Sequence, residues 1–265
     1  MDGVFFLKAT PQRASLGKDV KLVGLDPVSM GFACGGDDKY CSTAYSQMWS
    51  ALGGKAGVMP TLRKKYGING RVAFVSFSAG HGFMNPLLNV DSDRKDVSAV
   101  LLVDSTFGAG KTGYVKAAID ASFGRLLLAT ATSNTGGDND WRKYVWQPAI
   151  EASGKSPQKI SARAPMPEPS GGVFQLGDSL FYYRFVDAKG GTELPHWEMG
   201  KIQNKFVDAT LVPFWSGSLG GAGALEGGWR KWLPVAVGAA GAAAAVWLLL
   251  RKGGGGVSEL EEEDG

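Results

Sequence analysis

One serine in this sequence lies where a nucleophile would be placed. Residues 71–83 read R-V-A-F-V-S-F-S-A-G-H-G-F, in which an apolar run is followed by small residues. Residues 72–77 have the near-continuous apolar pattern of a buried strand, so Ser78 comes where that strand ends. A serine hydroxyl is a weak nucleophile that needs an adjacent base, and the chain has only two histidines, His81 and His196. These residues suggest acyl transfer through Ser78.

The pattern S-F-S-A-G resembles the nucleophile elbow of the α/β-hydrolase superfamily, which is written G-x-S-x-G. Gly80 matches the second glycine, and Ser76 stands in place of the first. Small residues are needed because the turn packs closely against the adjacent strand and helix. The resemblance covers roughly residues 3–212. It implies that Ser78 is the nucleophile and that the backbone N–H of Ala79 is one oxyanion donor.

The resemblance also implies where the base and the acid lie. In the superfamily the histidine follows the last strand and precedes the final helix, which fits His196, whereas His81 lies on the serine's own turn. The acid usually follows the second strand beyond the elbow, where Asp138 and Asp140 lie, but in some members it comes one strand earlier. Asp104 follows that earlier strand. We favour Asp104, because active-site residues collect at the carboxyl edge of parallel strands.

The second oxyanion donor has no motif of its own. No H-G-G-G-like loop is visible upstream of the elbow. The loop after the first apolar run is the expected source, with four residues to choose from: Thr10, Pro11, Gln12 and Arg13.

A glycine-rich segment at residues 108–113, G-A-G-K-T-G, offers a different chemistry. It resembles a phosphate-binding loop, whose pattern is G-x-x-x-x-G-K-[ST]. Ser105 stands where the first glycine of that pattern is required. Nucleotide binding through Lys111 is therefore only a third hypothesis.

The elements that must position these residues alternate between apolar strands and helices. Strands are predicted at residues 4–8, 20–25, 72–77, 97–103, 126–130, 159–162 and 180–186. Helices are predicted at residues 42–52, 61–66, 114–122, 141–152 and 202–207. Such alternation is typical of a parallel sheet covered on both faces. We therefore expect one three-layer α/β domain, hydrolase-like by resemblance, with a mostly parallel sheet over residues 1–215.

The C-terminal part has the composition of a membrane anchor. Residues 232–250 contain no charged residue, and at about 1.5 Å per residue they approach the roughly 30 Å of a bilayer core. Basic pairs flank both ends, so the charges give no orientation. We expect a single-pass transmembrane helix within 229–252, a glycine-rich linker at 216–228 and an acidic tail at 253–265. Glycines and alanines in the span permit close packing between copies of the chain.

Composition limits the remaining function classes. The net charge of +3 and the absence of a basic stripe give no nucleic-acid signature. Cys34 and Cys41 have no metal-ligand spacing, so they are free thiols, which we favour, or a disulfide. The first ten residues lack the basic and long apolar regions of a cleavable signal peptide.

The sequence thus predicts a membrane-anchored serine hydrolase that cleaves an ester or amide bond and needs no cofactor. The anchor makes lipid or cell-envelope esters reasonable substrates, by association. The chief alternative is a non-enzymatic structural or assembly protein with the same fold and anchor. The altered elbow and the missing H-G-G-G loop favour that alternative.

Overall fold

The structure, a computed structural model, describes the following parts of the chain: residues 1–8, 16–35, 41–106, 127–133, 142–177, 179–183, 185 and 196–216. The chain divides into two compact units, Met1–Ala224 and Leu225–Gly265, and all described residues belong to the first. The predicted span at 232–250 and the acidic tail lie outside the described residues. Within these residues, no helix is both long and apolar enough to cross a membrane.

An eight-stranded sheet forms the middle layer of the first unit, in the order β2-β1-β3-β4-β5-β8-β7-β6. Its strands are β1 (Asp2–Leu7), β2 (Val20–Leu25), β3 (Val72–Phe77), β4 (Ala99–Val103), β5 (Leu127–Thr132), β6 (Gln158–Ile160), β7 (Gly172–Leu176) and β8 (Ser179–Tyr183). The first six strands in that order run parallel, while β7 is antiparallel to both of its neighbours. The predicted α/β architecture with a mostly parallel sheet is confirmed.

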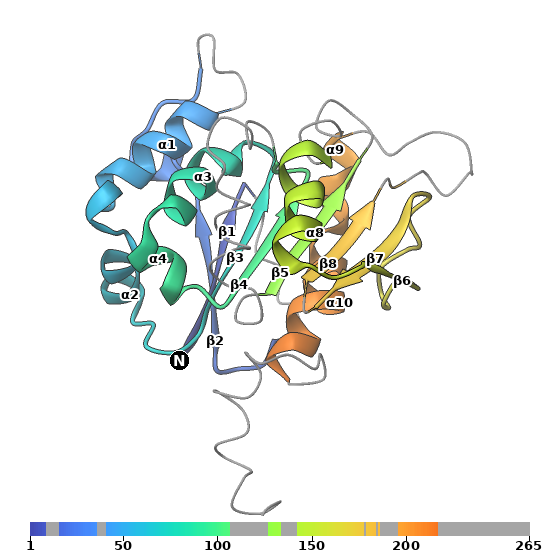
Figure 1. Cartoon of the computed structure of the whole chain (residues 1–265). Helices are drawn as coiled ribbons and strands as arrows, with labels where there is room; N and C mark the ends of the chain where they lie inside the picture. The colour runs from blue at the N-terminus through green and yellow to red at the C-terminus, as the bar shows by residue number, and fades with distance from the viewer. Residues whose placement is uncertain are drawn as a thin grey trace, which may run out of the picture. The chain divides into compact units, whose positions relative to one another are not determined.

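Helices cover both faces of this sheet (Figure 1). One face carries α1 (Ser42–Ala51), α2 (Met59–Tyr66), α3 (His81–Asn89), α4 (Asp91–Asp96) and α8 (Gln147–Ser153). The other face carries α9 (His196–Met199) and α10 (Gln203–Trp215). Short turns of tighter or wider helix are η1 (Val28–Met30), η2 (Gly54–Ala56), η3 (Ser78–Gly80), η4 (Arg142–Trp146) and η5 (Gly200–Ile202).

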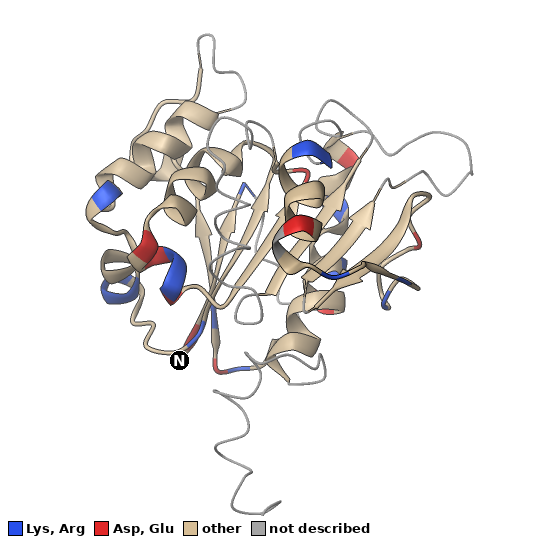
Figure 2. Cartoon of the chain, viewed as in Figure 1, with Lys and Arg blue, Asp and Glu red and all other residues tan. Residues whose placement is uncertain are grey.

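The alternation of side chains along each strand builds two cores, one on each face. Phe5 packs toward the α1–α4 side and stacks on Phe74, with ring centroids 5.2 Å apart. Val4 and Phe6, its neighbours in β1, belong to the core under α10. Figure 2 shows charged residues mainly on helices and near strand ends, with the central strands mostly free of them. Burial on both faces explains why these strands are apolar without interruption.

The register of the sheet brings the carboxyl ends of its central strands to one level. Leu7 of β1 pairs with Ser76 of β3, Phe77 pairs with Val103 of β4, and Val103 pairs with Ala131 of β5. The residues that follow these strands therefore begin at the same edge of the sheet, which is where active-site residues collect in parallel α/β folds.

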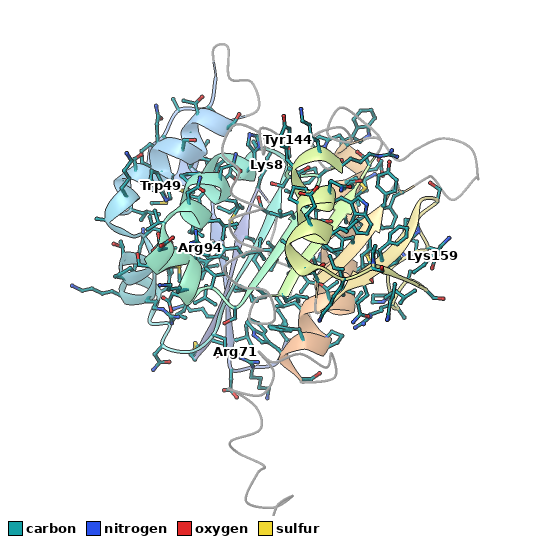
Figure 3. The ribbon with its side chains drawn as sticks, viewed as in Figure 1. Lys8, Trp49, Arg71, Arg94, Tyr144 and Lys159 are labelled. Atoms are coloured by element: carbon teal, nitrogen blue, oxygen red, sulfur yellow. A yellow bond between two sulfur atoms is a disulfide. The ribbon has the colours of Figure 1, made fainter. Side chains whose placement is uncertain are left out.

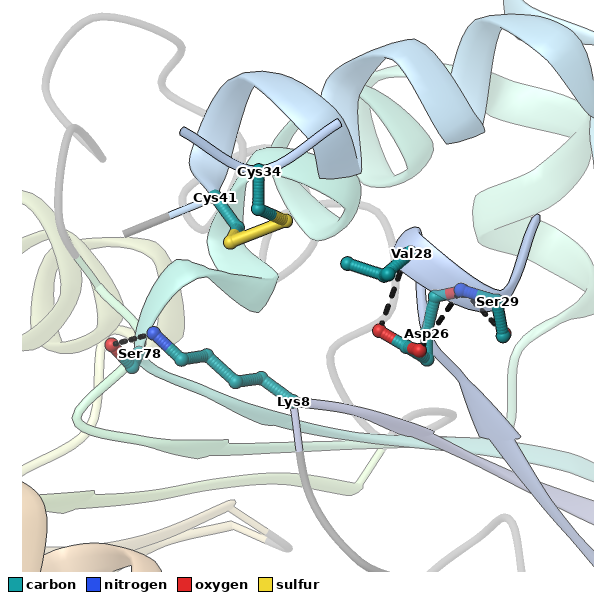
Figure 4. Close-up of a disulfide and its surroundings, with 7 residues drawn as sticks. All are labelled: Lys8, Asp26, Val28, Ser29, Cys34, Cys41 and Ser78. Atoms are coloured by element: carbon teal, nitrogen blue, oxygen red, sulfur yellow. Dashed lines mark hydrogen bonds between the residues drawn. A yellow bond between two sulfur atoms is a disulfide. The ribbon is translucent and has the colours of Figure 1, made fainter. Parts of the chain in front are cut away.

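Cys34 and Cys41 form a disulfide (Figure 4), so the expectation of free thiols was wrong. The sequence did not decide between the two states, because pairing depends on how closely the two Cα atoms approach. They lie 4.8 Å apart, within the usual range for a disulfide. The bridge joins the segment after η1 to the start of α1.

Candidate active site

Ser78 is the first residue after β3 and begins the short turn η3, which leads into α3. Its φ of +51° lies in the left-handed region, which is uncommon for residues other than glycine. Such backbone strain persists only when the surroundings impose it, and it clusters at functional sites. The residue is 5% exposed, so the turn holds the hydroxyl in a largely enclosed position at the carboxyl edge of the sheet.

Close packing explains the small residues on either side of Ser78. A Cβ added to Gly80 would lie 2.5 Å from Ser76 Oγ and 2.8 Å from Leu7 Cβ, so no side chain fits there. The Ser76 hydroxyl lies 2.6 Å from the Ser105 hydroxyl, which in turn donates to the Ser78 carbonyl at 3.1 Å. The serine that replaces the first glycine of the elbow pattern therefore fits, and its hydrogen bond links β3 to the residues after β4.

His196 is the histidine that reaches the Ser78 hydroxyl. Its Nε2 lies 2.8 Å from Ser78 Oγ, and its Nδ1 lies 3.0 Å from Asp104 Oδ2. The imidazole begins α9 and stacks on the Phe77 ring, with centroids 5.0 Å apart and planes 20° from parallel. The stack restricts the ring's rotation, so both of its nitrogens stay directed at their partners.

Asp104 follows β4 directly and also has a positive φ, +42°. Its Oδ1 accepts the Ser133 backbone N–H at 2.7 Å, and its Oδ2 accepts the Ser133 hydroxyl as well as His196 Nδ1. A carboxylate can only accept hydrogen bonds, so His196 Nδ1 carries the proton and Nε2 is left to accept from Ser78. This is the tautomer that a general base requires.

The structure brings three of the predicted site residues, Ser78, His196 and Asp104, into one hydrogen-bonded chain. His81 does not take the place of His196, since its Nδ1 lies 3.0 Å from the Ser78 carbonyl oxygen on the backbone side. Ala79 follows the serine within η3 and is 2% exposed.

Several other residues named by the sequence lie outside the described parts of the chain. These are Asp138 and Asp140, the loop at residues 10–13, and Lys111 in the phosphate-loop-like segment. Where the chain is described, no group of three or more His, Cys, Asp or Glu side chains is placed to hold a metal ion.

Lys8 is a site residue that the sequence interpretation missed. It follows β1 and is labelled in Figure 3. Its Nζ donates to Ser78 Oγ at 3.3 Å (Figure 4). Its φ is +57°. Four non-glycine residues of the described chain have a positive φ, and three of them, Lys8, Ser78 and Asp104, each follow a central strand. These three belong to the same hydrogen-bonded site. The available signal was a lysine directly after an apolar strand, at the edge where Ser78 also lies.

Comparisons of the chain with protein-family models, curated proteins and solved structures find no match. The function must therefore be argued from the chemistry of the site. That chemistry is a serine hydroxyl hydrogen-bonded to one imidazole nitrogen, with a carboxylate on the other nitrogen and an ammonium beside the hydroxyl oxygen.

Proposed function

We propose that the protein is a serine hydrolase of the α/β-hydrolase type, which cleaves an ester or amide bond with Ser78, His196 and Asp104. The observation that carries the proposal is the unbroken chain of hydrogen bonds from Asp104 through His196 to Ser78. Its members come from residues up to 118 apart in sequence. Two of them are held at positive φ, which supports a functional reason for the arrangement.

In the proposed reaction, Ser78 Oγ attacks the substrate carbonyl carbon while His196 Nε2 takes the hydroxyl proton. Asp104 holds the imidazole in the required tautomer and stabilises the positive charge that forms on it. The Ala79 N–H donates to the oxygen that becomes negative. His196 then gives the proton to the leaving group, and a water molecule, activated in the same way, releases the acyl group from Ser78.

We also propose that the hydrolase is held at a membrane by residues 232–250. Support for this comes from the uncharged apolar composition of the segment and its flanking basic pairs. With that anchor, lipid or cell-envelope esters are the substrates that the enzyme would meet. The fold alone does not select a substrate, because one α/β scaffold hosts many activities.

Hydrolysis of a p-nitrophenyl ester by the detergent-extracted full-length protein tests the enzymatic proposal. Ser78→Ala and His196→Ala should each lower kcat by about 10⁴-fold or more, as in other triads whose members act as a unit. Ser76→Ala is the matched control, because it too removes a buried serine hydroxyl, two residues earlier in the chain, and should retain activity. Wild-type protein that hydrolyses no ester or amide would favour the non-enzymatic alternative. A Ser78→Ala variant with full activity would show that Ser78 is not the nucleophile.

A further inference from the structure

The ammonium group of Lys8 occupies a position that the proposed reaction can use. Nζ lies within hydrogen-bonding distance of Ser78 Oγ, the atom that becomes bonded to the substrate carbonyl carbon. The oxyanion forms on the oxygen of that same carbon, only two bonds from Oγ. We propose that Lys8 is the second oxyanion donor and supplies a full positive charge beside the backbone N–H of Ala79. This inference rests on the proposed hydrolase function.

The backbone of Lys8 is held at the end of β1 by a hydrogen bond to α1. Its N–H donates to the hydroxyl of Tyr45, a residue of α1 that is 3% exposed. Burial raises the pKa of that phenol, which keeps it neutral. Figure 4 shows the Lys8 side chain extending from the end of β1 to Ser78. A lysine stem has enough rotatable bonds for Nζ to move from Oγ to an oxyanion nearby.

A cavity lies next to Lys8. Lys8 lines a pocket of about 360 Å³ together with Leu25, Val28, Tyr45 and the Cys34–Cys41 disulfide. The pocket lies on the side of β1 and β2, and its lining is largely apolar. Lys8 is the residue that it shares with the site, since Lys8 Nζ donates to Ser78 Oγ. The pocket is a suitable place for part of an acyl chain, with the carbonyl oxygen between Lys8 and the turn after β3.

The pocket lining also includes a carboxylate, that of Asp26. Asp26 follows β2 and accepts backbone N–H groups from Val28 at 3.3 Å and Ser29 at 3.0 Å. These bonds, drawn in Figure 4, hold the carboxylate on η1. The Lys8 ammonium contacts the reacting serine directly.

The proposed step balances without any further reactant. The pair of electrons on Oγ forms the bond to carbon, the hydroxyl proton moves to His196, and the carbonyl π electrons become the lone pair of the oxyanion. Lys8 keeps its proton and stabilises the new charge electrostatically. A donor that faces charge only in the transition state lowers the barrier without tightening substrate binding, so its loss should appear in kcat rather than in KM.

Lys8→Met tests the proposal in the full-length protein, because methionine keeps an unbranched apolar stem and removes the ammonium group with its charge and its hydrogen-bond donors. The left-handed backbone at position 8 stays equally strained. We expect kcat for a p-nitrophenyl ester to fall by about 10² to 10³-fold, the range for loss of one oxyanion donor, with KM almost unchanged. Lys21→Met is the control: it removes a lysine that donates to the Tyr66 carbonyl, and it should retain wild-type kcat. Lys8→Gln serves as a second neutral variant if Lys8→Met does not fold.

A spectroscopic measurement separates a catalytic lysine from a structural one. A trifluoromethyl ketone labelled with ¹³C at the carbonyl adds to Ser78 as a hemiketal, whose carbon shift reports ionisation of the oxygen. In the Lys8 variant the hemiketal should ionise at a pH about 2 higher than in wild type, if the same 10²-fold stabilisation is lost. Wild-type kcat in the variant, or unchanged hemiketal ionisation, would overturn the role of Lys8 and leave the serine hydrolase intact. Wild-type protein without hydrolytic activity would instead overturn the proposed function.

Discussion

Replacing Asp104 by asparagine should abolish most activity while leaving the fold in place. Asparagine has the size of aspartate and is among the residues that best tolerate a left-handed backbone, so the φ of +42° at this position remains acceptable. The change replaces one acceptor oxygen by an NH₂ group. Both carboxylate oxygens accept hydrogen bonds, so the amide must place its NH₂ against a donor whichever way it turns.

The two orientations differ in cost. If the NH₂ takes the place of Oδ1, it faces the Ser133 backbone N–H at 2.7 Å, and two buried donors in contact cost about 1–3 kcal/mol. If it takes the place of Oδ2, it faces His196 Nδ1, whose tautomer can change to accept from it. The second orientation is therefore favoured. It puts the proton on His196 Nε2, which can then no longer accept the proton of Ser78.

The loss in kcat should be about 10⁴-fold, as for the corresponding change in the serine-protease template, which is about 5.4 kcal/mol in barrier height. Steady-state hydrolysis of a p-nitrophenyl ester measures it, with circular dichroism to verify folding. Ser133→Ala removes one hydroxyl donor to the carboxylate and should cost on the order of tenfold. Asp138→Asn and Asp140→Asn should do little. The reasoning would be refuted if kcat of Asp104→Asn were within about tenfold of wild type while Asp138→Asn or Asp140→Asn lost most activity. The acid would then be Asp138 or Asp140.

Two further predictions concern packing and the C-terminal segment. Gly80→Ala should lower the free energy of unfolding by about 1–3 kcal/mol in urea titrations, because its Cβ would lie 2.8 Å from Leu7 Cβ. Gly35→Ala is the control, because nothing lies within 4 Å of a Cβ at that position. Equal stability of the two variants would contradict the packing argument. Deleting residues 229–265 should move the protein from the membrane to the soluble fraction, and unchanged partitioning would show that the segment is no anchor.

The sequence predicted the central strands well because burial on both faces leaves one readable pattern. The prediction at residues 72–77 coincides with β3, a central strand with all but its last residue buried. The prediction at residues 20–25 coincides with β2, although β2 is an edge strand and only partly buried. The strand β7 was missed, since Gly172–Leu176 follows a proline- and glycine-rich segment and lies near the sheet edge, where its pattern is short and interrupted by Gln175. The last helix was predicted at 202–207, but α10 continues to Trp215 and includes Pro213 in its final turn.

The candidate site was only partly readable for a related reason. Ser78 and Asp104 each directly follow an apolar run, so the local sequence indicates both. The chain has only two histidines, so the choice of general base lay between His81 and His196. For Lys8 and Ser133 the only local signal is that each directly follows a strand, which does not separate them from other strand-end residues. Their proximity to Ser78 and Asp104 depends on the pairing of β1 with β3 and of β4 with β5, which brings together residues 70 and 29 apart in sequence.

The most direct test of the central claim is to map the adduct of a fluorophosphonate probe on the folded, membrane-extracted protein by peptide mass spectrometry. The probe reacts only with a serine that a base has activated. We predict a single adduct on Ser78, which persists in Ser76→Ala and His81→Ala and disappears in His196→Ala. An adduct on Ser76, or no adduct on any serine of the folded protein, would contradict the account.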